Sequence, residues 1–222
     1  MISWKGVKLS WLGHDGFKIV TANDVIAIDP YKISVKSNDK ASVLFITHEH
    51  FDHCSPSDIR KVIDDRTIVI APEIARDCLR SFDNEKIFVK PGERYNEPIP
   101  FETVPAYNVN KFRAPGVVFH PKEDGRVGYV IDVGFRLYHA GDTDFVPEMR
   151  GLEAEVALLP VSGTYVMTPE EAAEAVKSMK GVKLAVPMHW GTIVGSVKDA
   201  LKFKELVEPL GIEVIVPERE AW

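Results

Sequence analysis

Short apolar or alternating segments separated by turn-forming residues fill the first third of the chain. We expect strands there at 7–12, 17–20, 25–29 and 43–47. Gly-His-Asp-Gly and Ala-Asn-Asp, which lie between the first three, are typical turn sequences. Ser55-Pro56-Ser57-Asp58 then has the pattern of a helix start, and predicts a helix to about residue 64 with Ser55 as its cap.

Strand and helix patterns alternate in the remainder of the chain. Strands are expected at 67–71, 156–160, 184–187 and 212–216, a hairpin at 129–139, and helices at 72–82, 168–179 and 196–210. This order predicts an α/β (α+β) protein with mixed sheets and helices outside, and not an all-parallel fold. No linker or low-complexity tract interrupts the pattern, so residues 1–222 are predicted to form a single domain.

Composition narrows the classes of partner and the compartment. The formal charge of −6 argues against broad binding to nucleic acid or anionic membranes. No apolar run approaches the ~20 residues that a membrane span needs, and residues 1–12 lack a signal-peptide core. Two cysteines, Cys54 and Cys78, are too few for a disulfide framework and fit a reducing cytoplasm, with Cys54 as a buried filler.

The densest candidate chemistry follows the expected strand at 43–47. Three of the seven histidines, His48, His50 and His53, lie there together with Asp52. Side chains alternate in an extended segment, so His48, His50 and Asp52 can point one way while His53 reaches a neighbouring position. A solvated polar loop is the alternative, but this density favours a site for two adjacent metal ions.

Two later loops carry further candidate ligands. Asp142 lies in Tyr-His-Ala-Gly-Asp-Thr-Asp and His189 in Pro-Met-His-Trp-Gly-Thr, each after an apolar strand. Taken alone, either can be an ordinary turn or a hydrogen-bonded histidine. The loop at 48–53 raises their weight because a metal centre needs ligands from several strand ends.

The segments 47–53, 141–143 and 188–191 together resemble the metallo-β-lactamase-fold superfamily, in matching order from residue 11 to residue 189. The likeness looks closest to compact metal-dependent hydrolases that include ascorbate-phosphate lactonases and N-acyl-phosphatidylethanolamine phospholipases. It implies a four-layer αββα sandwich of two mixed sheets flanked by helices, with the metal site at one edge. The implied ligands are His48 and His50 for the first metal, Asp52, His53 and His189 for the second, and Asp142 as a bridge.

One position departs from the family pattern. The first site normally has a third histidine in a Pro-Ala-x-His context, and here Pro105-Ala106-Tyr107 is followed by Asn108. An amide oxygen is a weaker ligand than imidazole, so the first site is expected to bind its ion weakly or to prefer a harder ion. Asn108 as a direct or water-mediated ligand is favoured; His120 reaching in from the next loop, or filling of the second site alone, are the alternatives.

The resemblance implies a metal-dependent hydrolase with two divalent ions, zinc by expectation and manganese, iron or nickel as alternatives. Two ions sharing Asp142 and a water would supply a metal-bound hydroxide near neutral pH, and Asp52 would orient it and shuttle its proton. Asp52 and Asp142 are therefore the expected catalytic residues. His14, in a turn that the family also has, is expected to orient a neighbour and not to bind metal.

The segment 108–116 is basic and aromatic within an acidic protein, so Lys111 and Arg113 are candidates to receive a phosphate or carboxylate. His120 and Tyr165 are further candidate substrate contacts, and a solvated loop explains 108–116 equally well. The expected partner is a small anionic ester, lactone or phosphodiester, and homo-oligomerisation stays open. The alternatives are a non-enzymatic metal-stabilised binding module and, less favoured for so short and acidic a chain, a nuclease. A diiron reductase is disfavoured because that branch has Glu where His50 stands.

Overall fold

Two seven-stranded mixed β-sheets form the framework of this protein. The computed structural model describes all residues, 1–222, and they fall into two compact units. Unit 1 comprises residues 1–90 and 217–222, and unit 2 comprises residues 91–216. Each unit contains one of the sheets with its own helices, so the expected α/β class with two mixed sheets is confirmed.

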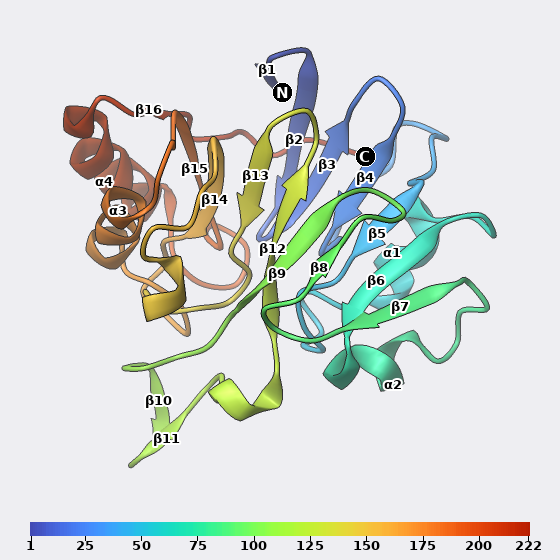
Figure 1. The fold of residues 1–222 in the computed structure, drawn as a ribbon, viewed down its shortest axis with the longest axis horizontal. Helices are drawn as coiled ribbons and strands as arrows, with labels where there is room; N and C mark the ends of the chain where they lie inside the picture. Colours follow the sequence, from blue (N-terminus) through green and yellow to red (C-terminus); the bar gives the residue numbers. More distant parts are fainter. The chain divides into compact units, whose positions relative to one another are not determined.

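The sheet of unit 1 runs in chain order, β1 to β7, and can be followed from blue to green in Figure 1. The first four strands are antiparallel and β4 to β7 are parallel. The strands are β1 (Ile2–Trp4), β2 (Val7–Gly13), β3 (Gly16–Val20), β4 (Val25–Ile28), β5 (Val43–Phe45), β6 (Ile68–Pro72) and β7 (Lys86–Val89). The helical segments are α1 (Pro56–Val62), the 3-10 turn η1 (Glu73–Ala75) and α2 (Arg76–Leu79).

The apolar residues of β5 fix the place of the histidine-rich loop. Val43–Phe45 is wholly buried, and α1 contributes Ile59 and Val62 to the same apolar cluster as Leu44. Helix α1 lies in the connection between β5 and β6, which pair in parallel. A parallel pair needs such a crossover connection, because the chain must return over the sheet before it pairs again. Ile28 of β4 is paired with Phe45 of β5, so the residues that follow both strands lie at the same sheet edge.

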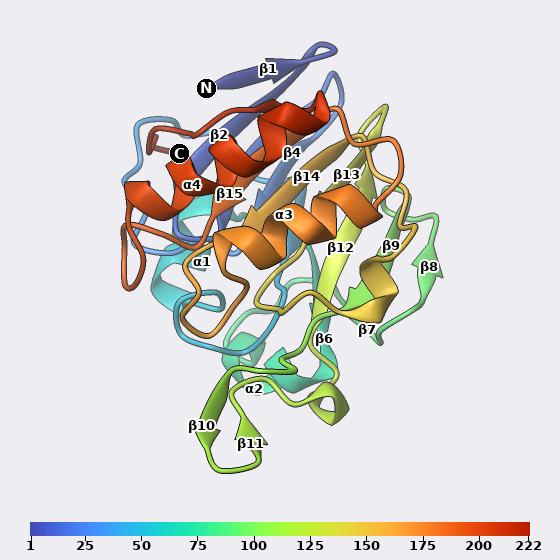
Figure 2. The same ribbon diagram turned by 90° about the vertical axis from the view of Figure 1, so that its left-hand side faces the viewer.

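The sheet of unit 2 has the order β16-β15-β14-β13-β12-β9-β8, with β13 to β16 parallel. Its strands are β8 (Arg94–Tyr95), β9 (Phe101–Pro105), β12 (Val127–Asp132), β13 (Arg136–His139), β14 (Val156–Pro160), β15 (Leu184–Met188) and β16 (Glu213–Val214). Between β9 and β12 the chain forms a separate hairpin, β10 (Phe112–Ala114) and β11 (Val117–Val118), which projects away from that sheet in Figure 2.

The helices of unit 2 are α3 (Pro169–Ser178) and α4 (Val197–Val207), which lie side by side along β14 and β15 (Figure 2). Three 3-10 turns complete the unit: η2 (Lys122–Asp124), η3 (Pro147–Met149) and η4 (Glu208–Leu210). Both helices begin with a capping residue, Thr168 and Ser196 respectively, each in a reciprocal capping box. None of the helices has the length and apolar character that crossing a bilayer requires.

Two helix predictions in unit 1 need correction. Ser55 stands at the N-cap position of α1, but its side chain makes no cap hydrogen bond and donates to Asp58 at 2.8 Å instead. The helix expected at 72–82 is only η1 and the four-residue α2, because β6 continues through Pro72, which pairs with Val89 of β7.

The prediction for the cysteines is also wrong, because Cys54 and Cys78 form a disulfide, with their Cα atoms 6.4 Å apart. Cys54 ends the histidine-rich loop and is buried, whereas Cys78 lies on α2 and is partly exposed. A single bridge needs only two cysteines that meet in space, and a sequence separation of 24 does not reveal that meeting. The bridge connects the loop to α2.

Replacing Cys78 by Ser should lower the free energy of unfolding by about 3 kcal/mol, because the bridge closes a loop of intermediate length in the unfolded chain. Urea denaturation with and without dithiothreitol measures the difference. Reduced wild-type protein should match the oxidant-insensitive variant. Identical midpoints for oxidised and reduced wild-type protein would contradict a bridge that contributes to stability.

Candidate metal centre

The loop after β5 arranges its four candidate ligands as two pairs. His48 Nε2 lies 3.1 Å from His50 Nδ1. His53 Nε2 lies 3.7 Å from Asp52 Oδ2. His48 and His53 are buried, while His50 and Asp52 are partly exposed. The assignment of one pair to each of two ions, which the family resemblance implies, stays a prediction.

Asp29, which follows β4, determines which nitrogens of this loop carry protons. Its buried carboxylate accepts hydrogen bonds from the Thr47 backbone N–H and hydroxyl, at 2.9 and 2.5 Å. It also contacts His53 Nδ1 at 2.8 Å. An ionised carboxylate only accepts, so Nδ1 of His53 carries the proton and Nε2 has the lone pair that a metal needs.

The same argument reaches His48 through Thr47. The Thr47 hydroxyl donates its one proton to Asp29, so its oxygen acts as an acceptor toward His48 Nδ1, 3.0 Å away. His48 Nε2 is then the nitrogen with the lone pair. Asp29 was not foreseen as a site residue; the signal for it was its position directly after a strand that neighbours β5.

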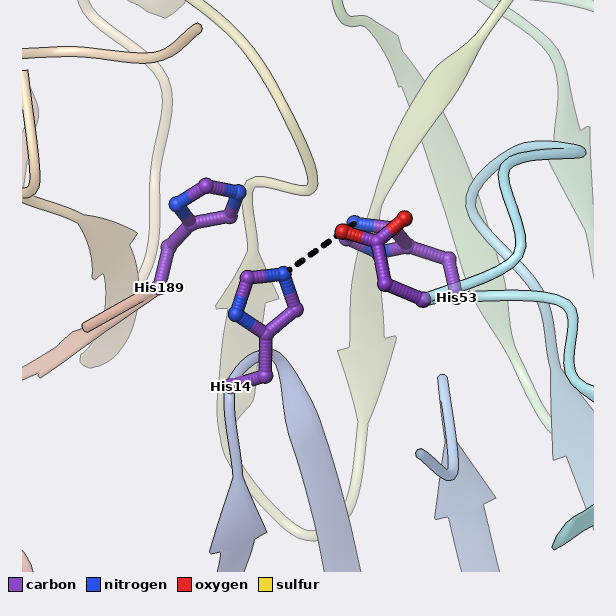
Figure 3. A group of neighbouring side chains, drawn as sticks. His14, His53 and His189 are labelled. Atoms are coloured by element: carbon purple, nitrogen blue, oxygen red, sulfur yellow. Dashed lines mark hydrogen bonds and ion pairs between the residues drawn. The ribbon is translucent and has the colours of Figure 1, made fainter. Parts of the chain in front are cut away.

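The turn between β2 and β3 brings His14 to the loop. His14 Nε2 lies 2.9 Å from Asp52 Oδ2, the contact drawn as a dashed line in Figure 3. His14 is fully buried, and its backbone oxygen accepts a hydrogen bond from Trp11 Nε1 at 2.8 Å. Asp15, also buried, places Oδ2 3.7 Å from His53 Nδ1. His14 therefore lies beside Asp52, and its role in orienting that carboxylate stays a prediction.

In unit 2, Asp142 has a histidine beside each of its carboxylate oxygens. Oδ1 lies 3.3 Å from Nε2 of His189, which directly follows β15 and is drawn in Figure 3. Oδ2 lies 3.5 Å from Nε2 of His120. All three residues are buried, and His189 Nδ1 lies 2.9 Å from Ser162 Oγ. The parallel pairing of β13, β14 and β15 accounts for the meeting of Asp142 and His189 at one sheet edge.

Asn108 lies beside His120 and contacts it through its side-chain carbonyl oxygen. That oxygen accepts from the His120 backbone N–H at 2.9 Å and lies 2.8 Å from His120 Nδ1. The Asn108 amide donates to the backbone oxygen of Tyr165 at 2.8 Å. The ring of Tyr165 packs edge-to-face against Phe119. The role of Asn108 as a ligand stays a prediction.

The two basic candidates of the hairpin differ in their surroundings. Lys111 Nζ lies 3.1 Å from Asp144 Oδ1 and 2.7 Å from Glu171 Oε2, and its side chain is 13% exposed. Burial raises the pKa of Glu171, but hydrogen bonds from Lys111 and Asn110 outweigh burial and hold that pKa below its usual value. Arg113 on β10 is exposed. Of these two candidates, Arg113 is therefore the one with an exposed charge.

Backbone strain gathers around the candidate ligands. Four of the six non-glycine residues with positive φ are His14, Asp29, Tyr165 and His189. A left-handed backbone is costly for residues with a Cβ, and such residues cluster where a side chain must be aimed at a functional site. Asp29 and His14 orient loop residues in unit 1, and His189 faces Asp142 in unit 2.

The donor sets fit divalent metal ions. Two ligands on one tetrahedral ion, each bound at about 2.0–2.2 Å, lie roughly 3.3–3.5 Å apart. The two Asp142 contacts have that separation, and the two pairs of the loop bracket it at 3.1 and 3.7 Å. Imidazole and carboxylate without thiolate suit zinc, iron, nickel or manganese.

Comparisons with known proteins agree with this chemistry. Residues 8–189 match the family model described as a beta-lactamase superfamily domain. A protein of Thermoplasma volcanium named UPF0173 metal-dependent hydrolase is 33% identical over 96% of this chain and 97% of its own length. A putative metal-dependent hydrolase from Parabacteroides distasonis has a similar structure, with a TM-score of 0.82, 30% identity, and coverage of 96% of this chain and 94% of that one.

The metallo hydrolase Igni18 from Ignicoccus hospitalis is also similar, with a TM-score of 0.76, 26% identity, and coverage of 96% of this chain and 95% of that one. The chain therefore belongs to the metallo-β-lactamase superfamily, within its group of metal-dependent hydrolases. The resemblance seen in the sequence is confirmed at the level of the superfamily.

Thr47→Val should weaken metal binding about 10- to 100-fold, because valine keeps the shape of threonine but removes the hydroxyl between Asp29 and His48. Competition with a chromophoric chelator measures the affinity. Thr47→Ser, which keeps the hydroxyl, is the matched control and should stay close to wild type. Equal affinities for the Val and Ser variants would show that Thr47 does not orient His48.

Lys111→Met should reduce stability most at neutral pH. The folded-state pKa of Glu171 is lowered, so its contribution is present above the unfolded value and is lost as pH falls through the folded one. The difference in unfolding midpoint between wild type and variant should therefore shrink between pH 7 and pH 4. A difference that stays constant over this interval would argue against the ion pair.

Proposed function

We propose that this chain hydrolyses small anionic esters, lactones or phosphodiesters with the help of two divalent ions. His48 and His50 would hold the first ion, Asp52, His53 and His189 the second, and Asp142 would bridge them. The observation that carries the proposal is Asp142, a buried carboxylate with one histidine Nε2 about 3.3–3.5 Å from each oxygen. The family match at 8–189 spans ligands from both units, which supports their action as a single domain.

Two bound ions would acidify a shared water toward neutral pH and polarise the scissile carbonyl or phosphoryl oxygen. Residues of the chain would orient the ligands and the water for this reaction. His14 holds Asp52 through Oδ2, and Asp52, partly exposed, is placed to orient a water and accept its proton. Asp29 keeps the lone pairs of His48 and His53 on Nε2.

The anionic character of the substrate rests on Arg113, which is exposed on the hairpin, and Tyr165 is the proposed neighbouring contact. Zinc is the proposed metal because imidazole and carboxylate ligands suit it. The cytoplasmic location of the protein stays a prediction from the sequence. The Cys54–Cys78 bridge speaks against it, since structural disulfides are rare in reducing compartments.

Wild-type protein should contain two equivalents of metal and hydrolyse at least one of three probes: bis(p-nitrophenyl) phosphate, p-nitrophenyl acetate or γ-butyrolactone. Asp142→Asn should lower turnover by at least about 100-fold, because a neutral amide cannot bridge two cations as a carboxylate does. Elemental analysis and initial rates measure both effects. Asp83→Asn, at an exposed position between α2 and β7, is the matched control and should leave both unchanged.

A non-enzymatic binding module predicts a different result. It would hold metal for the stability of the fold, so Asp142→Asn would lower the unfolding midpoint while the wild-type protein turned over none of the probes. Metal-dependent turnover that survives in Asp142→Asn would contradict the proposed role of Asp142.

A further inference from the structure

The hairpin between residues 108 and 120 places two polar side chains opposite each other at its base. The Asn108 backbone N–H donates to the His120 oxygen at 2.8 Å, and the Asn108 side-chain oxygen accepts from the His120 N–H at 2.9 Å. Further toward the tip of the hairpin, the Phe119 N–H donates to the Lys111 oxygen at 3.0 Å. Asn108 and His120 are both buried, at 5% and 1% exposure, so their contact lies in the interior of the protein.

The orientation of the Asn108 amide is fixed by its backbone partners. Nδ2 can only donate, and it faces the Tyr165 carbonyl oxygen at 2.8 Å. Oδ1 can only accept, and it faces the His120 backbone N–H. Turning the amide over would set donor against donor and acceptor against acceptor at these positions. Asn108 Oδ1 therefore points to His120 for reasons independent of the imidazole.

That orientation decides the tautomer of His120. Nδ1 of the imidazole lies 2.8 Å from Oδ1, an acceptor, so Nδ1 carries the proton. In the neutral ring Nε2 then has the lone pair. A neutral imidazole whose other nitrogen donates to a carbonyl or carboxylate oxygen is the usual form of a metal-binding histidine. Both lone pairs of Oδ1 are directed to His120, which leaves the amide oxygen poorly placed to bind an ion itself.

The Nε2 atom of His120 lies where a ligand should be. It is 3.5 Å from Asp142 Oδ2, and His189 Nε2 is 3.3 Å from Asp142 Oδ1. Each separation is close to the roughly 3.3–3.5 Å between ligands on one tetrahedral ion. Each carboxylate oxygen of Asp142 thus has the Nε2 atom of one histidine at a similar distance.

We propose that His120 supplies the third imidazole of the first metal site and that Asn108 is a positioning residue, which holds His120 in the ligand tautomer. This inference rests on the proposed two-ion hydrolase and deepens it. The third histidine would then lie twelve positions later in the chain than in the family pattern, on the opposite side of the hairpin base. Asn108, at the position where the family has its histidine, would support it. The first site would then have a full set of three histidines and normal affinity.

Metal titrations of four proteins test the proposal: wild type, His120→Gln, Asn108→Ala and the control Asn110→Ala, all as Co²⁺ forms with a chromophoric chelator as competitor. His120→Gln keeps a polar side chain of similar length, and circular dichroism checks each fold. Wild type and Asn110→Ala should bind two ions. His120→Gln should lose affinity for one ion by about 100-fold or more and change the Co²⁺ d–d spectrum, because a ligand is replaced.

Asn108→Ala should weaken the same ion about 10- to 100-fold, with the wild-type Co²⁺ spectrum restored at saturating metal, because a positioning residue changes affinity and not the ligand set. The proposal is overturned if Asn108→Ala changes the saturated spectrum while His120→Gln does not. It is also overturned if His120→Gln keeps both ions at wild-type affinity, a result that leaves the hydrolase itself standing. Wild-type protein that binds no ion would contradict both this inference and the proposed function.

Discussion

A histidine binds a metal ion only through a nitrogen without a proton. In a buried ring, the hydrogen bonds to the surrounding protein decide which nitrogen that is. For His53, His48 and His120, three acceptor oxygens meet this need. Asp29 fixes His53 directly, the Thr47 hydroxyl fixes His48, and Asn108 fixes His120. In each case Nδ1 is directed to the protein, which leaves Nε2 for the ion. The proposed metal site would therefore depend on a layer of hydrogen bonds behind its candidate ligands.

The topology of the sheets explains how that layer and the ligands come together within each unit. Parallel strands end at the same edge, so Asp29 after β4 meets the loop after β5, and Asp142 after β13 lies beside His189 after β15. The hairpin adds His120 to the second group, although its strands are not part of the sheet. The disulfide ties the end of the histidine loop to α2, so the loop is restrained at both ends.

Much of the fold and several candidate ligands could be predicted from local patterns in the sequence. The strands near 7–12, 156–160 and 184–187 and the helices α3 and α4 follow from short spacings. The motif at 48–53 and the family resemblance together indicate the candidate ligands there and at 142 and 189. What could not be read depends on contacts between distant residues. Asp29 looks like any acid after a strand, the cysteines are 24 residues apart, and nothing near Asn108 shows that its oxygen faces a histidine twelve residues later. The family pattern favours Asn108, because it places a ligand at that position, and the sequence offers His120 only as an alternative.

The proposed metal site requires that two ions share Asp142, with His120 and His189 at opposite oxygens of that carboxylate. A crystal structure of the zinc-loaded protein, with anomalous differences recorded on both sides of the zinc absorption edge, tests it most directly. We expect two zinc peaks about 3.5–4 Å apart, one within bonding distance of His120 Nε2 and the other of His189 Nε2. A single peak, or a zinc bound by Asn108 Oδ1 with His120 turned away, would contradict it.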